Sequence, residues 1–403
     1  MPKRARNLAV CPSRRKEKSP VSPCRSALSV LGVTFTLSKM KGRDLLADPP
    51  ADWEERGSVL LLNPRLGLGL RERILSADFP GLPDHFWMAS SGTSGRAKVI
   101  ALSRSAIEAS AAAVNRHLGV GLSDRWINPL PLFHVGGLGI VVRAALSKIP
   151  CHSFEEWNPR EFVRRSGECG ATLSSMVPAQ VHDLVSAQLP CPPSMRAIVV
   201  GGGTLDESLR VRAAHLGWPL LPSYGMTEAA SQVATARPGA KDFSWLPLLD
   251  HVEARAGDDG GLELRGPSLL TGLMLLDTDG PARWEDPKRD GWFRTNDRVE
   301  LRDGRLRFIG RADDLIKIRG ELVDIAALER ELQSYVASGL VRIDAERDER
   351  NGSALSVVAE NASAEAEARG AIDVFPPYAR PAVFRLGPVA VSPLGKRIRP
   401  IRL

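Results

Sequence analysis

From about residue 30 onward, short apolar runs of strand length alternate with stretches in which apolar residues recur at helical spacing. This alternation predicts an α/β protein. The apolar run Ala197–Val200 is typical of a buried strand, and it ends at three consecutive glycines, 201–203. Because Thr204 and Glu207 have the spacing of a capping box, we expect a helix to start there and to end at Gly217.

Three further elements have clear patterns. Ser105 and Glu108 form a second capping box, which predicts an Ala-rich helix that stops at Gly119. Asp303-Gly304 separates two apolar runs and predicts a β-hairpin. A helix is then expected to begin near Asp324 and to bury one apolar face, formed by Ile325, Leu328, Leu332 and Val336.

A chain of 403 residues is long enough for two or three packed domains. We expect a basic tail over residues 1–30, a large domain over residues 31–310 and a small C-terminal domain over residues 311–403. No apolar run is long enough to cross a bilayer, and the five cysteines form no CxxC pair. These observations argue against a membrane-inserted protein, a zinc ribbon and a disulfide scaffold.

The net charge of +7 is concentrated in the tail. Residues 1–30 contain eight basic side chains and one acidic side chain, so the remaining residues sum to zero. A nucleic-acid-binding surface on the folded body is therefore not implied. The tail is rich in Ser and Pro, and we expect it to be disordered. Its composition fits an organelle transit peptide as well as an inert extension.

The segment Ser90–Lys98 holds four hydroxyls, two glycines and a lysine within nine residues. A polyphosphate can be surrounded by three kinds of donor: the backbone amides that glycine exposes, side-chain hydroxyls, and the ammonium group of a lysine. The segment is not a Walker A loop, because no Lys-Ser or Lys-Thr pair follows a glycine; a Ser/Gly linker is the alternative. Gly137 and Gly139 do not complete a dinucleotide-binding motif, because Val142 occupies the third glycine position.

Two more segments carry polar groups of defined chemistry. Tyr224 offers an aromatic face beside Gly225, and Thr227-Glu228 offers a phosphate contact and a hard oxygen ligand for Mg²⁺. Asp297 closes the segment Gly291–Asp297 and can accept both hydroxyls of a ribose. Taken alone, Glu228 is equally well explained as a surface carboxylate and Asp297 as the start of a turn.

Five segments together resemble the acyl-adenylate-forming, or AMP-binding, enzyme superfamily in order and spacing. They are Ser90–Lys98, Tyr224–Glu228, Gly291–Asp297, Gly310–Gly320 and Pro393–Lys396. The resemblance spans about three quarters of the chain. It implies a large adenylate-forming N-terminal domain of stacked α/β subdomains with a small β-barrel-like part. A small, mobile α+β C-terminal domain would follow.

The resemblance also implies roles for individual residues. The implied ATP-binding residues are Ser91, Gly92, Thr93, Ser94, Gly95, Lys98, Gly202, Gly203, Tyr224, Gly225, Asp297 and Arg311. The implied catalytic residues are Lys396, Thr227 and Glu228, and Glu228 would also hold Mg²⁺. Asp313 matches the hinge between the domains, and Gly320 lies near the path expected for coenzyme A.

The acid-binding part resembles the o-succinylbenzoate–CoA ligases of menaquinone synthesis. The similarity lies in the segment 129–143 and in Ser223–Ala234, and the implied acid-binding residues are His134, Arg143, Gly201 and Ser231, with Gln232 beside them. Arg143 lies in an otherwise apolar, glycine-rich segment, where a buried guanidinium is costly without a counter-ion. It either reaches the surface or binds a second carboxylate of the substrate.

The resemblance implies an ATP-dependent acid–CoA ligase that uses ATP, Mg²⁺ and coenzyme A on a carboxylic acid, most simply a diacid. Cytoplasmic location and a homodimer are the accompanying expectations, without nucleic-acid or membrane partners. Two alternatives stay open: an adenylating enzyme for another acid or for a carrier protein, and a non-catalytic adenylate-binding protein. Leu322 follows Gly320-Glu321 where an asparagine is commoner, which leaves the acceptor of the acyl group open as well.

Overall fold

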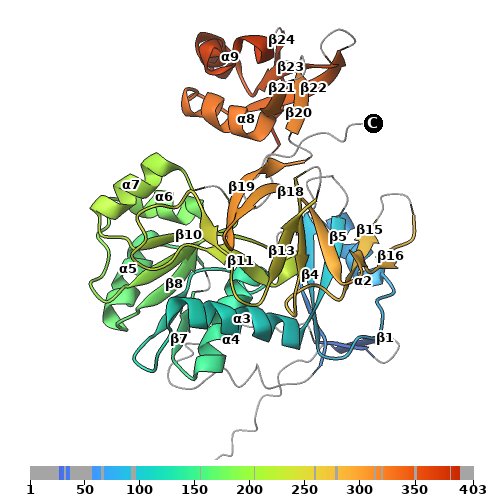
Figure 1. Cartoon of the computed structure of the whole chain (residues 1–403), viewed down its shortest axis with the longest axis vertical. Helices are drawn as coiled ribbons and strands as arrows, with labels where there is room; N and C mark the ends of the chain where they lie inside the picture. The colour runs from blue at the N-terminus through green and yellow to red at the C-terminus, as the bar shows by residue number, and fades with distance from the viewer. Residues whose placement is uncertain are drawn as a thin grey trace, which may run out of the picture.

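The computed structural model describes residues 27–30, 33–36, 57–64, 68–91, 97–154, 156–203, 205–257, 260–276, 280–312, 315–318, 321–348, 352–381 and 383–390. The expected tail therefore lies almost entirely outside the described residues. The chain is an α/β protein, as predicted, and several sheets are arranged in layers within its larger part (Figure 1).

The central layer is a six-stranded sheet in which five parallel strands are joined by one antiparallel edge strand. Its order is β11 (Ser231–Thr235), β10 (Leu220–Met226), β9 (Ala197–Val200), β8 (Leu173–Met176), β6 (Trp126–Asn128) and β7 (Cys151–Ser153). Five helices connect or flank these strands: α3 (Arg104–Leu118), α4 (Val135–Ser147), α5 (Pro159–Glu168), α6 (Pro178–Ser186) and α7 (Glu207–His215).

Strand β9 is apolar throughout because both faces of this sheet are covered. Ala197 and Val199 face a core shared with α3 and α4, whereas Ile198 and Val200 face a core shared with α5, α6 and α7. The predicted buried strand is therefore confirmed. Parallel strands with helices on both faces place the strands' carboxyl ends, and the loops that follow them, at one edge of the sheet.

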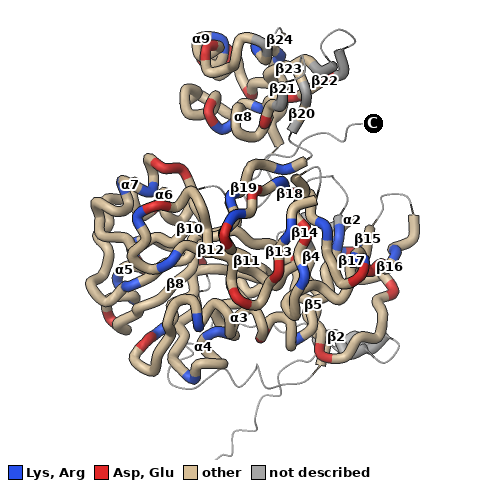
Figure 2. The backbone as a smooth tube through the Cα atoms, viewed as in Figure 1, with Lys and Arg blue, Asp and Glu red and all other residues tan. Residues whose placement is uncertain are grey.

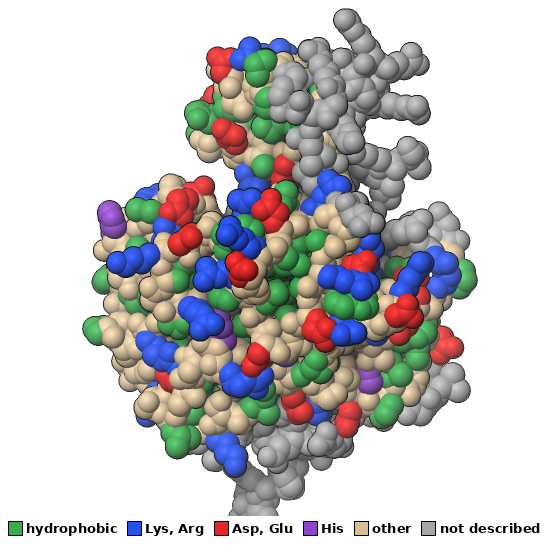
Figure 3. All heavy atoms as spheres, viewed as in Figure 1, with side chains coloured by type: hydrophobic (Ala, Val, Ile, Leu, Met, Phe, Trp, Pro, Cys, Tyr) green, Lys and Arg blue, Asp and Glu red, His purple; other side chains and the backbone are tan. Residues whose placement is uncertain are grey.

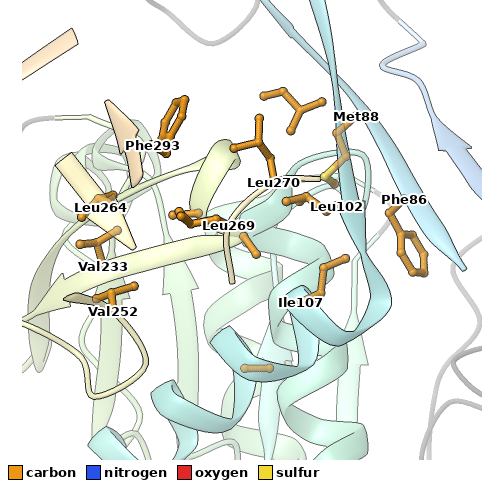
Figure 4. Close-up of a cluster of buried hydrophobic side chains, with 14 of the residues drawn as sticks. Phe86, Met88, Leu102, Ile107, Val233, Val252, Leu264, Leu269, Leu270 and Phe293 are labelled. Atoms are coloured by element: carbon orange, nitrogen blue, oxygen red, sulfur yellow. The ribbon is translucent and has the colours of Figure 1, made fainter. Parts of the chain in front are cut away.

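A second sheet has five strands and is covered on one face by helix α2 (Leu68–Ser76). Its order is β16 (Arg283–Glu285), β15 (Gly272–Leu276), β5 (Ala97–Ser103), β4 (His85–Ser91) and β3 (Val59–Leu61). The other face contributes Phe86 and Met88 to a core that also includes Ile107 of α3 and Val233 of β11 (Figure 4). The two sheets are thereby joined through one shared apolar core.

A third sheet is antiparallel. It contains β12 (Leu246–Pro247), β19 (Arg305–Arg311), β18 (Trp292–Arg302), β14 (Gly261–Arg265) and β13 (Glu253–Ala256), with β17 (Lys288–Arg289) paired to β18. The predicted hairpin joins β18 and β19, and both turn residues, Asp303 and Gly304, have the positive φ that such a turn needs. A separate two-stranded sheet pairs β1 (Ala27–Val30) with β2 (Val33–Thr36).

The C-terminal elements form a lobe with a hydrophobic core of its own (Figure 1). They are β20 (Leu315–Ile318), β21 (Glu321–Asp324), α8 (Ile325–Ser334), β22 (Val341–Asp348), β23 (Gly352–Ala359), α9 (Ala362–Gly370), the 3₁₀ turns Ile372–Val374 and Pro377–Ala379, and β24 (Val383–Leu386). Helix α8 begins after Asp324, which caps it, and buries Ile325, Leu328 and Leu332, as predicted. Val336 is buried as well, but it lies beyond the end of the helix at Ser334. The proposed boundary near Arg311 stays a prediction.

Two capping predictions were wrong. Helix α3 is capped by Ser103, which accepts a hydrogen bond from the amide of Ala106, and not by Ser105. Helix α7 is capped by Asp206, which accepts from the amides of Ser208 and Leu209, so Glu207 is its first residue. In both places a second residue suited to capping stands two positions away, and it is the one that accepts the amide hydrogen bonds; Thr204 itself lies outside the described residues. The predicted stop of α3 at Gly119 is confirmed by its φ of +58°.

Charged residues of both signs are interspersed along the larger part of the chain (Figure 2), and the face seen in Figure 3 shows the same mixture of charged side chains. Within the described residues, no helix combines the length and the apolar composition needed to cross a bilayer.

Candidate active site

Several of the expected residues lie outside the part of the chain that the structure describes. They are Gly92, Thr93, Ser94 and Gly95 of the phosphate loop, together with Asp313, Gly320 and Lys396. Only the backbone of Ser91 is described, as the last residue of β4. The structure therefore describes all the residues expected to bind the acid and most of those expected to bind the nucleotide, and the roles of all these residues stay predictions.

Lys98 and Glu228 form an ion pair, with Nζ 2.6 Å from Oε1. Lys98 belongs to β5, whereas Glu228 belongs to the 3₁₀ turn Thr227–Ala229 that follows β10 of the central sheet. The backbone carbonyl of Glu228 accepts a hydrogen bond from the amide of Leu270, which fixes the turn against the neighbouring segment. One ammonium and one carboxylate from two different sheets thus meet at a partly buried point.

A magnesium ion fits this point only together with a phosphate ligand. Among the described residues, no cluster of three or more His, Cys, Asp or Glu side chains could enclose a metal ion. Mg²⁺ commonly binds one or two carboxylates and completes its shell with substrate phosphates and water. Glu228 supplies such a carboxylate beside the ammonium of Lys98, so the donor set matches a metal that arrives with a nucleotide.

Tyr224, Asp297 and Arg311 form a second polar group. The hydroxyl of Tyr224 donates to Oδ2 of Asp297 at 2.6 Å, and Nε of Arg311 lies 3.5 Å from Oδ1. Asp297 and Arg311 are cross-strand partners in β18 and β19. Burial and the neighbouring Asp297 carboxylate raise the pKa of Tyr224 well above its ordinary value, so the phenol keeps its proton. The ring of Tyr224 stacks on Phe308, with centroids 5.7 Å apart.

Gly225 is required by the shape of the strand pair that carries Tyr224. The register between β10 and β11 shifts at this position, and a Cβ atom on Gly225 would lie 2.0 Å from the carbonyl oxygen of Ser231. Ala230 and Ser231 have positive φ angles of 51° and 124°, which non-glycine residues rarely adopt. Backbone strain of this kind is typical of functional sites, where the surrounding packing holds it in place.

Arg143 of α4 is a fully buried cation. It is only 1% exposed, so of the two alternatives the one in which it reaches the surface is wrong. Nη1 donates to Ser175 Oγ and Nη2 to Ser231 Oγ, each at 3.3 Å, and the guanidinium carbon lies 5.6 Å from the ring centre of Trp126. Burial lowers its pKa to about 9.

No carboxylate pairs with Arg143 among the described residues, and its Nε has no hydrogen-bond partner there. A buried cation with neutral partners only is costly for the folded protein. The N–H groups of the guanidinium that remain available could donate hydrogen bonds to an anion, and the described part of the chain provides no such anion.

Glycines and a histidine border the same edge of the central sheet. Gly201–Gly203 follow the carboxyl end of β9, and a Cβ atom on Gly201 would lie 3.0 Å from Ser223 Oγ. His134 precedes α4 and packs its ring against Phe133 at 4.6 Å between centroids. Burial lowers the pKa of His134, so the imidazole is neutral near pH 7. A neutral ring is suited to packing against a substrate rather than to binding its carboxylate.

Three contributors were not foreseen from the sequence: Trp126, Ser175 and Phe308. Ser175 carried a usable signal, because a hydroxyl inside the buried strand Leu173–Met176 needs a polar partner. Trp126 and Phe308 carried none, since an apolar residue in a strand is ordinarily a core residue.

Residues 82–270 match the family model described as AMP-binding enzyme. That region is similar to the AMP-binding enzyme family. It contains Lys98, Arg143, Tyr224 and Glu228, whereas Asp297 lies beyond it.

Curated relatives of this AMP-binding region are 2-succinylbenzoate–CoA ligases. The chain is 30% identical to the ligase of Bacillus licheniformis over 261 residues, which are 62% of this chain and 54% of the relative. It is 29% identical to that of Listeria monocytogenes EGD-e over 275 residues, 66% of this chain and 57% of the relative. The chain thus spans little more than half the length of the curated relatives that it matches.

Solved structures agree on the fold. The o-succinylbenzoate CoA synthetase of Bacillus subtilis in complex with the acyl-adenylate intermediate superposes with a TM-score of 0.70 at 22% identity, covering 85% of this chain and 77% of that chain. The same enzyme in complex with ATP and magnesium ion gives 0.68 at 21% identity, with 85% and 78% covered. The fold is that of an adenylate-forming enzyme, as predicted.

Proposed function

We propose that this protein is an ATP-dependent acid–CoA ligase, and that its acid is o-succinylbenzoate. The observation that carries the activity is the meeting of Lys98 and Glu228, which supplies a phosphate-binding cation and a metal-binding carboxylate at one point. The observation that carries the diacid is the buried guanidinium of Arg143, which lacks an acidic partner among the described residues.

In the first step, an oxygen of the substrate's succinyl carboxylate attacks the α-phosphorus of ATP. The bond between the α-phosphorus and the bridging oxygen breaks, pyrophosphate leaves, and an acyl-adenylate forms. Two anions must approach each other, so positioning and charge neutralisation supply most of the catalysis. Lys98 binds the phosphates, Thr227 contacts the α-phosphate, and Lys396 is proposed to approach from the C-terminal domain. Glu228 would hold a magnesium ion, which would supply positive charge to neutralise the phosphates.

The nucleotide would lie along β10 and the β18–β19 hairpin. The ring of Tyr224 provides a flat face for the base, and Gly225 allows close approach to the backbone. Asp297 accepts hydrogen bonds from the ribose hydroxyls, and Arg311, whose Nε lies 3.5 Å from Oδ1 of Asp297, helps to orient that carboxylate. Gly202 and Gly203 line the same region, and the residues 91–95 would surround the phosphates.

The acid would lie between the central sheet and α4. Arg143 binds the carboxylate on the aromatic ring of the substrate, and Ser231 helps to orient the guanidinium at 3.3 Å. His134 and Gly201 line the remaining wall. This arrangement leaves the succinyl carboxylate free to reach the α-phosphate.

In the second step, the sulfur of coenzyme A attacks the acyl carbon, the bond to the AMP oxygen breaks, and the thioester and AMP are released. We propose that the C-terminal domain turns about Asp313 between the steps, which withdraws Lys396 and brings Gly320 to the path of the thiol. A homodimer and a cytoplasmic location are the accompanying proposals.

The test is release of pyrophosphate and AMP by the purified full-length chain with Mg²⁺, ATP and a panel of carboxylic acids, with and without coenzyme A. We expect o-succinylbenzoate to give the highest kcat/KM and a thioester only when coenzyme A is present. Pyrophosphate release without formation of a thioester would show that the acyl acceptor is not coenzyme A but another group, such as a carrier protein. No AMP from any acid would overturn the proposed function.

A further inference from the structure

A gap beside the guanidinium of Arg143 is created by Gly139. The two residues are separated by one turn of α4 and lie on the same side of that helix. A Cβ atom on Gly139 would lie 3.1 Å from Nη2 and 3.6 Å from Cζ of Arg143. Non-bonded heavy atoms prefer separations of roughly 3.5–4.0 Å. Any other residue at position 139 would therefore press on the end of the Arg143 side chain.

The guanidinium has little room to retreat from such a pressure. Trp126 covers its face, and Ser175 holds Nη1 at 3.3 Å. Trp126 is fully buried and Ser175 is 6% exposed, so both are fixed by the core around them. A displacement of a few tenths of an ångström at Nη2 is therefore transmitted to the hydrogen bonds of the guanidinium.

The bond that would be lost first joins Nη2 to Ser231. Its length of 3.3 Å is already at the long end of the range for such bonds. Ser231 cannot follow the guanidinium easily, because its backbone is strained at φ 124° and its carbonyl oxygen lies against Gly225. The orientation of the cation thus depends on empty space at position 139.

We propose that Gly139 is a specificity-determining position, and that its missing side chain allows Arg143 to present its guanidinium to a second carboxylate of the substrate. The proposal rests on the diacid specificity proposed above. Gly139 acts through Arg143 and touches no reacting atom, so it is a positioning residue. Its replacement should reduce the preference for a diacid more than it reduces turnover in general.

The test compares two acids that differ by one carboxylate. They are o-succinylbenzoate and 4-oxo-4-phenylbutanoate, which keeps the succinyl carboxylate and lacks the one on the ring. Pyrophosphate release gives kcat/KM for each acid, and their ratio measures the preference for the diacid. The variants of the full chain are Gly139→Ala, Arg143→Ala and the double variant. Alanine favours the helix more than glycine does, so Gly139→Ala is expected to fold.

Gly167→Ala serves as the matched control. It makes the same chemical change in α5, and a Cβ atom at position 167 has no neighbour within 4 Å among the described residues. We expect Gly139→Ala to lower the preference ratio by at least about tenfold, because a hydrogen bond to a charged group is weakened. Gly167→Ala should keep the wild-type ratio. In the Arg143→Ala background, Gly139→Ala should have no further effect on the ratio.

The possible outcomes separate this inference from the proposed function. If the wild type prefers the diacid and Gly139→Ala keeps that preference, Gly139 has no positioning role and the inference is wrong. An additive effect of Gly139→Ala in the Arg143→Ala background would contradict it as well, since Gly139 would then act on another group. A wild type that releases no pyrophosphate from either acid would instead overturn the proposed function. In that case, isothermal titration of the protein with each of the two acids measures the preference for the diacid without turnover, as a ratio of dissociation constants.

Discussion

Lys98 and Glu228 neutralise each other across two sheets, with 2.6 Å between the ammonium nitrogen and the carboxylate oxygen. In the proposed reaction these two groups bind opposite partners, the phosphates and the metal. The binding of Mg²⁺ and the binding of nucleotide are therefore expected to strengthen each other. A phosphate bound to Lys98 leaves Glu228 free for the metal, and a metal bound to Glu228 leaves Lys98 free for the phosphate. This relationship leads to the first prediction.

Replacing Glu228 by Gln should raise the Mg²⁺ concentration needed for half-maximal pyrophosphate release. The amide keeps the shape of the side chain but is a weaker ligand for a hard cation. Lys98→Ala should lower kcat/KM for ATP by about 10²–10³, the usual loss for one preorganised contact to developing charge. Titrations of Mg²⁺ and of ATP measure the two effects. Unchanged Mg²⁺ dependence in Glu228→Gln would remove Glu228 from the metal site.

Replacing Arg143 by Leu should stabilise the protein while it removes the preference for a diacid. The guanidinium is buried beside neutral partners only, among the described residues, so an apolar side chain avoids its desolvation cost. We expect the free energy of unfolding to rise by about 1–3 kcal/mol, measured by urea denaturation at pH 7. A variant that gains stability and loses substrate specificity is the result expected when the replaced residue serves binding rather than folding.

A paired arginine provides the control for that measurement. Arg196 donates two hydrogen bonds to Asp124, at 2.8 and 2.7 Å, and holds the backbone carbonyls of Leu118 and Gly119 as well. Arg196→Leu leaves the Asp124 carboxylate, which is 7% exposed, without its cation and should destabilise the protein by about 2–4 kcal/mol. Equal losses of stability in Arg143→Leu and Arg196→Leu would show that Arg143 is a structural residue.

Replacing Tyr224 by Phe should raise KM for ATP with little change in kcat. The variant keeps the aromatic face but loses the hydrogen bond to Asp297, and with it the orientation of the carboxylate proposed to bind the ribose. One such bond contributes about 1 kcal/mol, so a fivefold rise in KM is expected, roughly. Steady-state kinetics at saturating acid measure it. A fall in kcat with unchanged KM would place Tyr224 at the reacting phosphate instead.

Elements with a strong local pattern were predicted well from the sequence. The buried strand Ala197–Val200, the turn at Asp303 and the helix after Asp324 each depend on neighbours within a few positions. The starts of α3 and α7 were misplaced, because Ser103 and Asp206 are residues that cap helices as well as the predicted Ser105 and Thr204 do. Local patterns therefore predict the type of an element better than its first residue.

The candidate site was predicted as far as single side chains reveal their chemistry. Arg143 could be named because a charge in an apolar segment needs a reason, whereas Glu228 could be named only because its segment resembles a motif of a known family. Arg143 is surrounded by Ser175 and Trp126 because their strands, β8 and β6, are neighbours in the sheet that packs against α4. No local sequence pattern reveals that order of strands. The gap at Gly139 is likewise visible only once the Arg143 side chain has been placed.

The last prediction concerns His251, which is 8% exposed and has no hydrogen-bond partner for either ring nitrogen among the described residues. Burial lowers its pKa from 6.5 to about 4, although Asp250 raises it slightly and Arg116 lowers it further. The unfolded chain takes up a proton near the ordinary pKa, whereas the folded protein resists it until about pH 4. The contribution of neutral His251 to the free energy of unfolding is therefore fully present above pH 6.5, and it is lost as the pH decreases from 6.5 to 4.

Urea denaturation between pH 7 and pH 4 should show this loss, which amounts to about 3 kcal/mol for a single group with that shift. His251→Leu should lose correspondingly less over the same range, because its side chain takes up no proton. His182→Leu is the matched control: the His182 side chain is 62% exposed, so its replacement should keep the wild-type slope. If His251→Leu and the wild type lose stability in parallel, His251 is accessible to protons in the folded protein, and other groups are responsible for the acid sensitivity.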